Sequence, residues 1–160
     1  MKTWVMMRHA KSSWAFDLPD RERPLTERGV RDASLVGERL STMNCKFDKV
    51  CSSPAKRAFD TALLVTSSLG IDTTSVELEE ELYDFSGNQV LNFVHSQEES
   101  ISNIITFGHN NACLFLAKTL GRYNLDNLPT ATAVIFRFDV SLWSQITDCK
   151  CSVIIPKEIR

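Results

Sequence analysis

The sequence predicts an α/β fold, a three-layer α/β/α sandwich in which helices cover both faces of a mostly parallel sheet. Short apolar runs alternate along the chain with longer segments whose apolar residues recur at helical spacing. Capping residues such as Thr26 and Gly70 mark helix ends between these runs. No repeat, low-complexity tract or linker divides the 160 residues, so we expect a single domain over 1–160.

The charge balance and hydropathy exclude several classes of protein. The chain has 18 Lys and Arg against 20 Asp and Glu, a formal net charge of −2. A nearly neutral chain is a poor candidate for general binding to nucleic acid or to an anionic membrane. No apolar stretch reaches the length of about 18 residues that suggests a membrane helix, and no charged-then-apolar leader opens the chain. We therefore expect a cytoplasmic protein with neither nucleic acid nor membrane as a partner.

Cysteine usage points to a reducing compartment. The five cysteines are odd in number, and some lie in or beside apolar runs, which favours free thiols over disulfides. The pair Cys149-x-Cys151 stands alone without a second pair, so it is a weak metal signal. Structural thiols are the better interpretation, and we expect no metal and no cofactor.

The first part of the chain predicts a strand, a long loop, a helix and a second strand. Residues 4–7 form a short apolar run and the expected first strand. Residues 10–24 contain several Asp and Pro breakers and are expected to form a loop. Thr26 can cap a helix whose apolar stripe reaches Met43. The second strand is expected over 47–52.

A second helix is expected to begin at Ser53-Pro54. Serine suits the N-cap and proline suits the first helical position. The helix has an alanine-rich apolar stripe, and Gly70 is expected to end it. Beyond it, residues 76–78 predict a short strand and residues 88–95 a short amphipathic helix.

The last part of the chain continues the alternation of strands and helices. Residues 101–107 contain a buried strand, and residues 112–120 form a helix closed by Gly121. Residues 133–138 and 153–155 are expected to complete the sheet.

The residues with informative chemistry lie directly after predicted strands. Arg8 and His9 follow the first strand, and His109 follows the strand that ends near residue 107. Ser52-Ser53-Pro54 follows the second strand, with Arg57 shortly after it. Ligands of open α/β sheets bind outside the carboxyl ends of the strands. We therefore expect these side chains to meet in one crevice.

Two arginines and two histidines together suit phosphoryl transfer. Arginine presents a planar fork of donors that matches phosphate oxygens. A neutral imidazole nitrogen can attack phosphorus and hold the phosphoryl group covalently, without a metal. Taken singly, each residue also fits a structural role: Arg8-His9 as a surface pair, His109 as a helix cap, and Arg57 as a solvated helix residue. Their joint placement favours the active-site interpretation.

Five segments carry a resemblance to a known family. They are Arg8-His9-Ala10-Lys11-Ser12-Ser13-Trp14, Pro24-Leu25-Thr26-Glu27-Arg28-Gly29, Ser52-Ser53-Pro54-Ala55-Lys56-Arg57-Ala58, Thr61-Ala62 and Gly108-His109-Asn110. With these segments the chain resembles the histidine phosphatase superfamily, which has the phosphoglycerate mutase-like fold. Its short length and the opening Arg-His-Ala-Lys-Ser-Ser-Trp look most like the SixA-type phosphohistidine phosphatase branch.

The resemblance implies a role for each matching residue. His9 would be the nucleophile that becomes phosphorylated, and Arg8, Arg57 and His109 would bind the phosphoryl group. Ser12 aligns with a small phosphate-contacting residue of the family, although an ordinary loop serine fits equally well. Three further arginines could extend the basic rim but are expected mainly as surface residues: Arg21, Arg23 and Arg28.

Two positions depart from the family pattern. Many members have an asparagine where this chain has Ala15. Larger members carry a glutamate acid in a Leu-x-Glu-x-x-Gly segment, and residues 82–87 resemble that spacing with Asp84 in place of glutamate. Asp84 is thus a candidate proton donor, and an ordinary aspartate at a helix entrance is the alternative.

The expected function is metal-independent hydrolysis through a phosphohistidine intermediate on His9. The doubtful acid and the lack of lid-forming insertions favour a labile P–N bond, as in phosphohistidine on a protein. A phosphorylated protein is therefore the expected partner, with a small phosphorylated substrate as an alternative. A phosphomonoesterase or mutase of the same superfamily remains open. So does a catalytically weak phosphopeptide-binding module.

Overall fold

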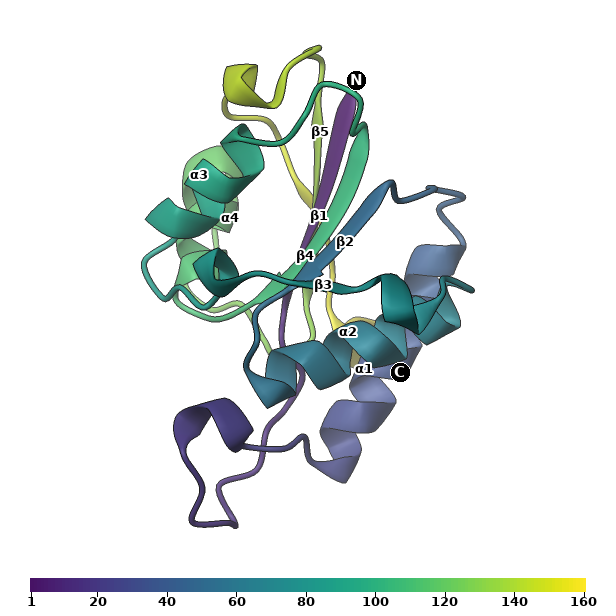
Figure 1. The fold of residues 1–160 in the computed structure, drawn as a ribbon, viewed down its shortest axis with the longest axis vertical. Coiled ribbons are helices and arrows are strands. Elements are labelled where there is room, and N and C mark those ends of the chain that lie inside the picture. The colour runs from purple at the N-terminus through teal and green to yellow at the C-terminus, as the bar shows by residue number, and fades with distance from the viewer.

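Six strands form one sheet in the computed structural model, which describes residues 1–160 (Figure 1). Their order across the sheet is β3-β2-β4-β1-β5-β6. They are β1 (Lys2–Arg8), β2 (Lys49–Ser52), β3 (Glu77–Leu78), β4 (Asn103–Gly108), β5 (Ala133–Phe138) and β6 (Ser152–Ile154). Strands β1 to β4 pair in parallel, whereas β5 runs antiparallel to its neighbours β1 and β6. The prediction of a mostly parallel sheet is confirmed.

Helices cover both faces of this sheet. They are α1 (Glu27–Ser41), α2 (Lys56–Ser68), α3 (Asn88–His95), α4 (Ala112–Gly121) and α5 (Pro156–Ile159). Helices α1 and α2 lie on one face and α3 and α4 on the other (Figure 1), so the predicted three layers are confirmed. None of the helices combines the length and apolar character needed to cross a membrane.

The central strand β1 supplies both cores because its side chains alternate between the two faces. Val5 and Met7 pack into the cluster under α1 and α2. Trp4 and Met6 pack into the cluster under α3 and α4. Fully burying an apolar side chain of this size contributes roughly 1.5–3 kcal/mol, so both layers hold the sheet firmly.

The register of the parallel strands brings three carboxyl ends to one edge of the sheet. Arg8 of β1 lies opposite Gly108 of β4, and Ser52 of β2 lies opposite Phe107 of β4. The backbone N–H of His9 donates to the carbonyl of Gly108 at 3.0 Å, which continues the pairing past the end of β1. Segments far apart in the sequence therefore meet where the candidate side chains emerge.

Helix α1 begins as the sequence predicts. The Thr26 hydroxyl accepts a hydrogen bond from the backbone N–H of Gly29 at 3.0 Å, as an N-cap does. The predicted short helix over 88–95 coincides with α3, Asn88–His95. Gly70 has φ of 73° just after α2, which confirms it as the left-handed residue that ends that helix.

The predicted start of α2 at Ser53-Pro54 is wrong. The helix begins at Lys56, and Ser53 is still extended because its backbone N–H donates to the carbonyl of Phe107 at 2.9 Å. The hydrogen bonds of the sheet thus compete with helix formation at Ser53. Its hydroxyl contacts the ring of His109 and the backbone N–H of Ala55.

Gly121 does not act as the expected cap of α4. It is the last residue of that helix, and Arg122 adopts the left-handed conformation with φ of 55°. A side chain at Gly121 would meet the sulfur of Cys151 at 2.7 Å. Close packing against the chain at Cys151 therefore explains this glycine better than helix termination.

Candidate active site

Arg57 joins the two histidines that the sequence placed at separate strand ends. Its Nε donates to His9 Nε2 at 3.3 Å, and its Nη2 contacts His109 Nδ1 at 3.3 Å. The two imidazole centroids lie 5.5 Å apart. The guanidinium is almost completely buried in the first turn of α2. One cation thus organises both rings, and the fold brings these three residues together.

The hydrogen bonds of His9 define which ring nitrogen is free to react. Its Nδ1 lies 2.7 Å from the carbonyl oxygen of Ala10, so Nδ1 carries the proton and Nε2 keeps its lone pair. Burial lowers the pKa of His9 most, and nearby Arg57 and Arg8 lower it further. These effects outweigh the hydrogen bond to Ala10, and the pKa falls to about 4. The ring is therefore neutral at neutral pH, as a nucleophile requires.

His109 is held in a fixed orientation by Ser53. The Ser53 hydroxyl lies 2.8 Å from His109 Nε2, while Nδ1 faces Arg57. Since Arg57 can only donate, Nδ1 accepts and Nε2 carries the proton. Burial, then Arg57 and then His9 lower the pKa of His109 to about 3. The sequence placed Ser53 at a strand end but interpreted it only as a helix cap.

Arg8 reaches the same crevice from the end of β1. Its Nη1 donates to the carbonyl of Leu128, while its buried Nε has no hydrogen-bond partner. Burial lowers the pKa of Arg8, with Cys113 opposing that effect. Arg8 and His9 line a cavity of about 260 Å³ together with Arg57.

The cavity is strongly cationic. Four of its lining side chains are basic, and Asp20 is its one acidic residue. The basic residues are Arg8, Lys11, Arg23 and Arg57. Such an excess of positive charge in a concave site attracts anions, and arginine forks match the oxygens of a phosphoryl group.

Arg23 is a site residue that the sequence interpretation placed mainly on the surface. It is buried, its Nη1 donates to the Ser12 hydroxyl at 2.7 Å, and its guanidinium lies 3.6 Å from the Trp14 ring centroid. Ser12 is buried and also lines the cavity. Arg21 and Arg28 are exposed, as expected. No local pattern separates Arg23 from those two arginines.

Asp20 and Tyr83 are two further site residues that sequence reasoning missed. The Asp20 carboxylate accepts hydrogen bonds from Arg57 Nη2 at 3.0 Å and from the Tyr83 hydroxyl. Its backbone carbonyl accepts from Arg57 Nη1 at 2.7 Å. Burial raises the pKa of Asp20, but the bonds from Tyr83 and Arg57 outweigh it and lower the pKa to about 2. The sequence identified Asp20 only as a loop breaker.

Asp84 does not lie in the cavity, which corrects the expectation that it supplies a proton. Its carboxylate accepts from the backbone N–H groups of Gly87 at 2.9 Å, Gln89 at 3.1 Å and Val90 at 3.2 Å. Burial raises the pKa of Asp84, but these bonds and those from Ser86 lower it overall. The ionised side chain thus caps α3, which agrees with the alternative of an aspartate at a helix entrance.

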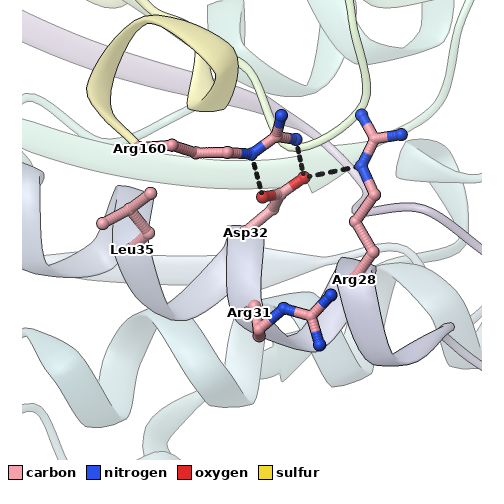
Figure 2. A pocket seen from close by; sticks show the side chains of 5 residues that line it. All are labelled: Arg28, Arg31, Asp32, Leu35 and Arg160. Atoms are coloured by element: carbon pink, nitrogen blue, oxygen red, sulfur yellow. Dashed lines mark hydrogen bonds and ion pairs between the residues drawn. The ribbon is translucent and has the colours of Figure 1, made fainter.

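A larger cavity of about 560 Å³ lies between α1 and the C-terminal residue. Figure 2 shows Asp32 within it, bound by Arg160 through two hydrogen bonds of 2.9 and 3.1 Å and by Arg28 at 3.5 Å. Arg31 and Leu35 complete its lining. No histidine or cysteine lines this cavity, and its one carboxylate, Asp32, is occupied by arginines, so its size does not make it the candidate active site.

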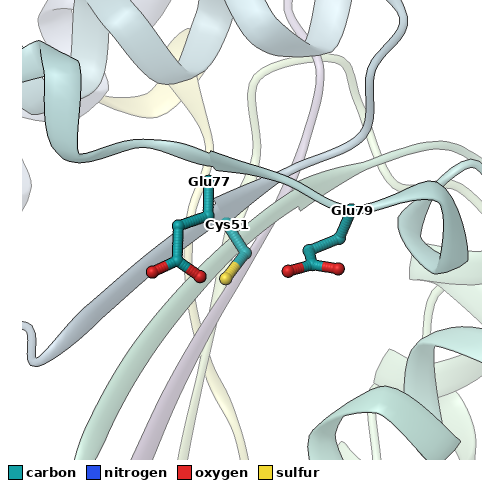
Figure 3. A group of neighbouring side chains, drawn as sticks. All are labelled: Cys51, Glu77 and Glu79. Atoms are coloured by element: carbon teal, nitrogen blue, oxygen red, sulfur yellow. The ribbon is translucent and has the colours of Figure 1, made fainter.

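One group of side chains has the spacing of metal ligands. Figure 3 shows Cys51 with Glu77 and Glu79, whose ligand atoms lie within 4.8 Å of one another. Burial raises the pKa of the Cys51 thiol to about 12, so the thiolate that a metal needs is disfavoured. Glu77 also pairs with Lys49 at 3.7 Å. This donor set fits a metal poorly.

Comparisons with known proteins agree with this geometry. The sequence model of the histidine phosphatase superfamily (branch 1) matches residues 4–104. An uncharacterized protein of Mycobacterium tuberculosis is 29% identical over 135 residues, which is 84% of this chain and 82% of that protein. The structure of the protein histidine phosphatase SixA complexed with tungstate has a TM-score of 0.80 at 19% identity and covers 99% of both chains. A mycobacterial glucosyl-3-phosphoglycerate phosphatase with inorganic phosphate has a TM-score of 0.63 at 15% identity, over 97% of this chain and 96% of that one.

Proposed function

The chain belongs to the histidine phosphatase superfamily, and from this we propose that residues 1–160 form one metal-independent phosphatase domain with His9 as nucleophile. Members of this superfamily are phosphatases or mutases. The observation that carries the proposal is the unprotonated Nε2 of His9, which lies 3.3 Å from the guanidinium of Arg57. A nucleophile and a phosphate-binding cation thus adjoin each other in a cationic cavity.

The first chemical step follows from these contacts. The lone pair of His9 Nε2 attacks phosphorus, and the bond to the leaving group breaks. Arg57 and Arg8 bind the phosphoryl oxygens, so that their charge stabilises the transition state. Arg57 must exchange its resting contacts with the imidazoles for contacts with the phosphoryl group. In the second step water attacks phosphorus and the electron pair returns to Nε2.

His109 assists as a second phosphate-binding group. In the resting site its Nδ1 accepts from Arg57. A bound phosphoryl dianion favours the protonated imidazole, whose Nδ1–H can then donate to a phosphoryl oxygen. Ser53 fixes the orientation of this ring through its contact with Nε2. The burial that keeps His109 neutral at rest thus prepares it to take up a proton with the substrate.

Phosphohistidine on a protein is the substrate that the site supports best. The cavity of about 260 Å³ is below the usual size of small-molecule pockets, so it suits a phosphoryl group on a small ring. Trp14 stands at its rim with 77% of its surface exposed, where a protein can contact it. An imidazole also leaves phosphorus more easily than an alkoxide does. The SixA likeness supports the same choice.

A small-molecule phosphomonoesterase or mutase is the second candidate. The structural likeness to a glucosyl-3-phosphoglycerate phosphatase favours it, because the same fold there serves a small phosphorylated molecule. A phosphopeptide-binding module is a third candidate of another class. It does not need a nucleophile, whereas this chain retains His9 with a free lone pair.

Phosphoenzyme trapping tests the nucleophile. The wild type, His9→Ala and His95→Ala are mixed with radiolabelled phosphoramidate and quenched in base, where phosphohistidine survives. We expect acid-labile label on the wild type and on His95→Ala, which changes the one histidine outside the site. We expect none on His9→Ala. Equal labelling of His9→Ala would disprove the covalent mechanism.

A substrate panel then separates the three candidates. It compares a phosphohistidine-carrying protein, a phosphotyrosine peptide and a sugar phosphate by kcat/KM. We expect the phosphohistidine protein to be preferred. A preference for the sugar phosphate selects the second candidate, and binding without turnover of any substrate selects the third.

A further inference from the structure

The proposed mechanism leaves one role without a residue. A group must give a proton to the leaving atom in the first step and take one from water in the second. Asp84 cannot do this because its carboxylate faces the N-terminus of α3. Asp20, in the short 3-10 helix η1 (Asp20–Glu22), is the one acidic residue among those that line the cavity.

Building on the proposed function, we propose that Asp20 is this proton donor and acceptor, and that Tyr83 positions its carboxylate. Both the nucleophile and this carboxylate contact the same guanidinium. Arg57 Nε bonds to His9 Nε2 at 3.3 Å, and Arg57 Nη2 bonds to Asp20 Oδ2 at 3.0 Å. A phosphoryl group bound to Arg57 therefore lies within reach of both residues.

The position of Asp20 is set by contacts from a second segment. The Tyr83 hydroxyl donates to Oδ2, and Arg23 Nε donates to Oδ1 at 3.4 Å. The neighbouring Arg21 forms two hydrogen bonds of 2.8 and 2.9 Å with Glu80 and lies 4.2 Å from the Tyr83 ring centroid. These contacts tie the loop that carries Asp20 to the segment before α3. The carboxylate thus stays at the cavity when Arg57 turns to the substrate.

Substrate binding changes the charge state of Asp20 in the required direction. At rest, burial raises the pKa of Asp20, while Tyr83 and Arg57 lower it to about 2, so the side chain is ionised. A phosphoryl dianion takes the hydrogen bonds of Arg57 and adds negative charge nearby. Both effects raise the pKa of the carboxyl group, which then takes a proton from solvent. Arg23 stays at Oδ1 and limits this rise, and the protonated ring of His109 adds positive charge that limits it further, whereas the ring of His9 stays neutral.

The two steps balance with Asp20 in this role. In the first, a bond forms between His9 Nε2 and phosphorus, the bond to the leaving atom breaks, and that atom takes the Asp20 proton. In the second, a water oxygen bonds to phosphorus, the bond to Nε2 breaks, and the Asp20 carboxylate takes the water proton. Inorganic phosphate leaves, Asp20 releases its proton to solvent, and both residues return to their resting state.

A comparison of two leaving groups tests the assignment. Asp20→Asn keeps the shape of the side chain but has no acidic proton, and Asp17→Asn changes an exposed aspartate of the same loop. Both variants and the wild type are assayed on phenyl phosphate, which needs a proton donor, and on p-nitrophenyl phosphate, whose leaving group is a stable anion. We expect Asp20→Asn to lose about 10²-fold in kcat/KM, which reports only the first step, on phenyl phosphate and far less on p-nitrophenyl phosphate. Asp17→Asn should match the wild type.

Tyr83→Phe gives the expected intermediate result. This variant keeps the Asp20 carboxyl group but removes the hydrogen bond that positions it. Its loss of kcat/KM should again be larger on phenyl phosphate than on p-nitrophenyl phosphate, but smaller than that of Asp20→Asn. Equal losses in kcat/KM of Asp20→Asn on both substrates would show that Asp20 only positions Arg57. No loss on either substrate would also overturn the assignment.

Two further measurements keep the test decisive. If Asp20→Asn does not fold, wild-type rates on substituted phenyl phosphates replace it, and a steep fall with rising leaving-group pKa overturns the proposal because no donor is then acting. Trapping the phosphoenzyme separates the two hypotheses. If His9 carries no label, the proposed function fails. If His9 is labelled but Asp20→Asn loses activity equally on both substrates, only the role of Asp20 is refuted and the proposed function stands.

Discussion

Two arginine–aspartate clusters in this molecule have opposite patterns of burial. The site cluster pairs Asp20 with Arg57, and the helix cluster pairs Asp32 with Arg160. In the site cluster the arginine side chain is 2% exposed and the aspartate 44%. In the helix cluster the aspartate is 4% exposed and the arginine 42%. Similar ion pairs thus bury the cation in one place and the anion in the other.

The difference explains why only one cluster suits catalysis. A buried carboxylate such as Asp32 cannot leave its partners without a large desolvation cost, so it fixes α1 to the C-terminal residue. A buried guanidinium with an exposed carboxylate can exchange that carboxylate for another anion at lower cost. Arg57 also contacts two imidazoles, whereas no histidine lies near Asp32. The exchangeable anion and the two adjacent imidazoles distinguish the site cluster.

The largest contrast is expected when each cluster loses its arginine and turnover is measured. Arg57→Ala should lower kcat by about 10²–10³-fold, the usual effect of losing a preorganised donor. Arg160→Ala is the matched control and should leave kcat unchanged. Because Arg57 is buried and not solvated, its removal should also lower the free energy of unfolding by about 1–3 kcal/mol. Equal turnover of the two variants would contradict the distinction.

The site cluster should also impose a pH dependence on stability. The folded pKa values of about 4 for His9 and about 3 for His109 lie below the ordinary value of 6.5. Below pH 6.5 the two histidines of the unfolded chain therefore bind protons, whereas those of the folded chain stay unprotonated. The free energy of unfolding should fall by up to about 1.4 kcal/mol per pH unit for each histidine as pH drops toward 4. Chemical denaturation from pH 7.5 to 4 measures this slope.

A double variant identifies the source of that slope. His9→Gln combined with His109→Gln should flatten the profile between pH 6.5 and 4. Asp20 acts in a lower window, because its pKa of about 2 is below the ordinary 3.8 and its contribution is lost only as pH falls through that range. An unchanged slope in the double variant would show that other groups cause it.

The helix cluster should affect stability alone. Arg160→Ala leaves the buried Asp32 with only the contact to Arg28 at 3.5 Å. The free energy of unfolding should fall by about 2 kcal/mol, less than for a fully buried pair because Arg160 is partly exposed. Urea denaturation measures the change, and Arg31→Ala, which removes an unpaired arginine of the same cavity, should have little effect. A loss of turnover per folded molecule would contradict the structural role.

The smallest effect is expected at Asp84, which belongs to neither cluster. Asp84→Asn should lower the free energy of unfolding by about 1 kcal/mol, because a charged cap of α3 becomes a neutral one. Its kcat on phenyl phosphate and p-nitrophenyl phosphate should equal that of the wild type. A selective loss on phenyl phosphate would instead restore Asp84 as the acid and count against Asp20.

The sequence was most informative where a pattern is local. The apolar spacing and Thr26 cap predicted α1, and a short apolar run predicted β5, because both depend on residues a few positions apart. The positions of His9 and His109 at strand ends also followed from short segments. Arg23 was misinterpreted because loop conformation brings it against Ser12 and Trp14. Ser53 was misinterpreted because strand register brings it against His109.

By itself the sequence determined the fold class, the order of strands and helices, and the strand-end positions of the arginines and histidines to which we assign phosphoryl transfer. Only the tertiary structure decided that Asp20 and Tyr83 join the site and that Asp84 does not. The physical reason lies in the range of the interactions. Helical spacing and capping act within a few residues, whereas the hydrogen bonds of a carboxylate depend on which segments the packed sheet brings beside it.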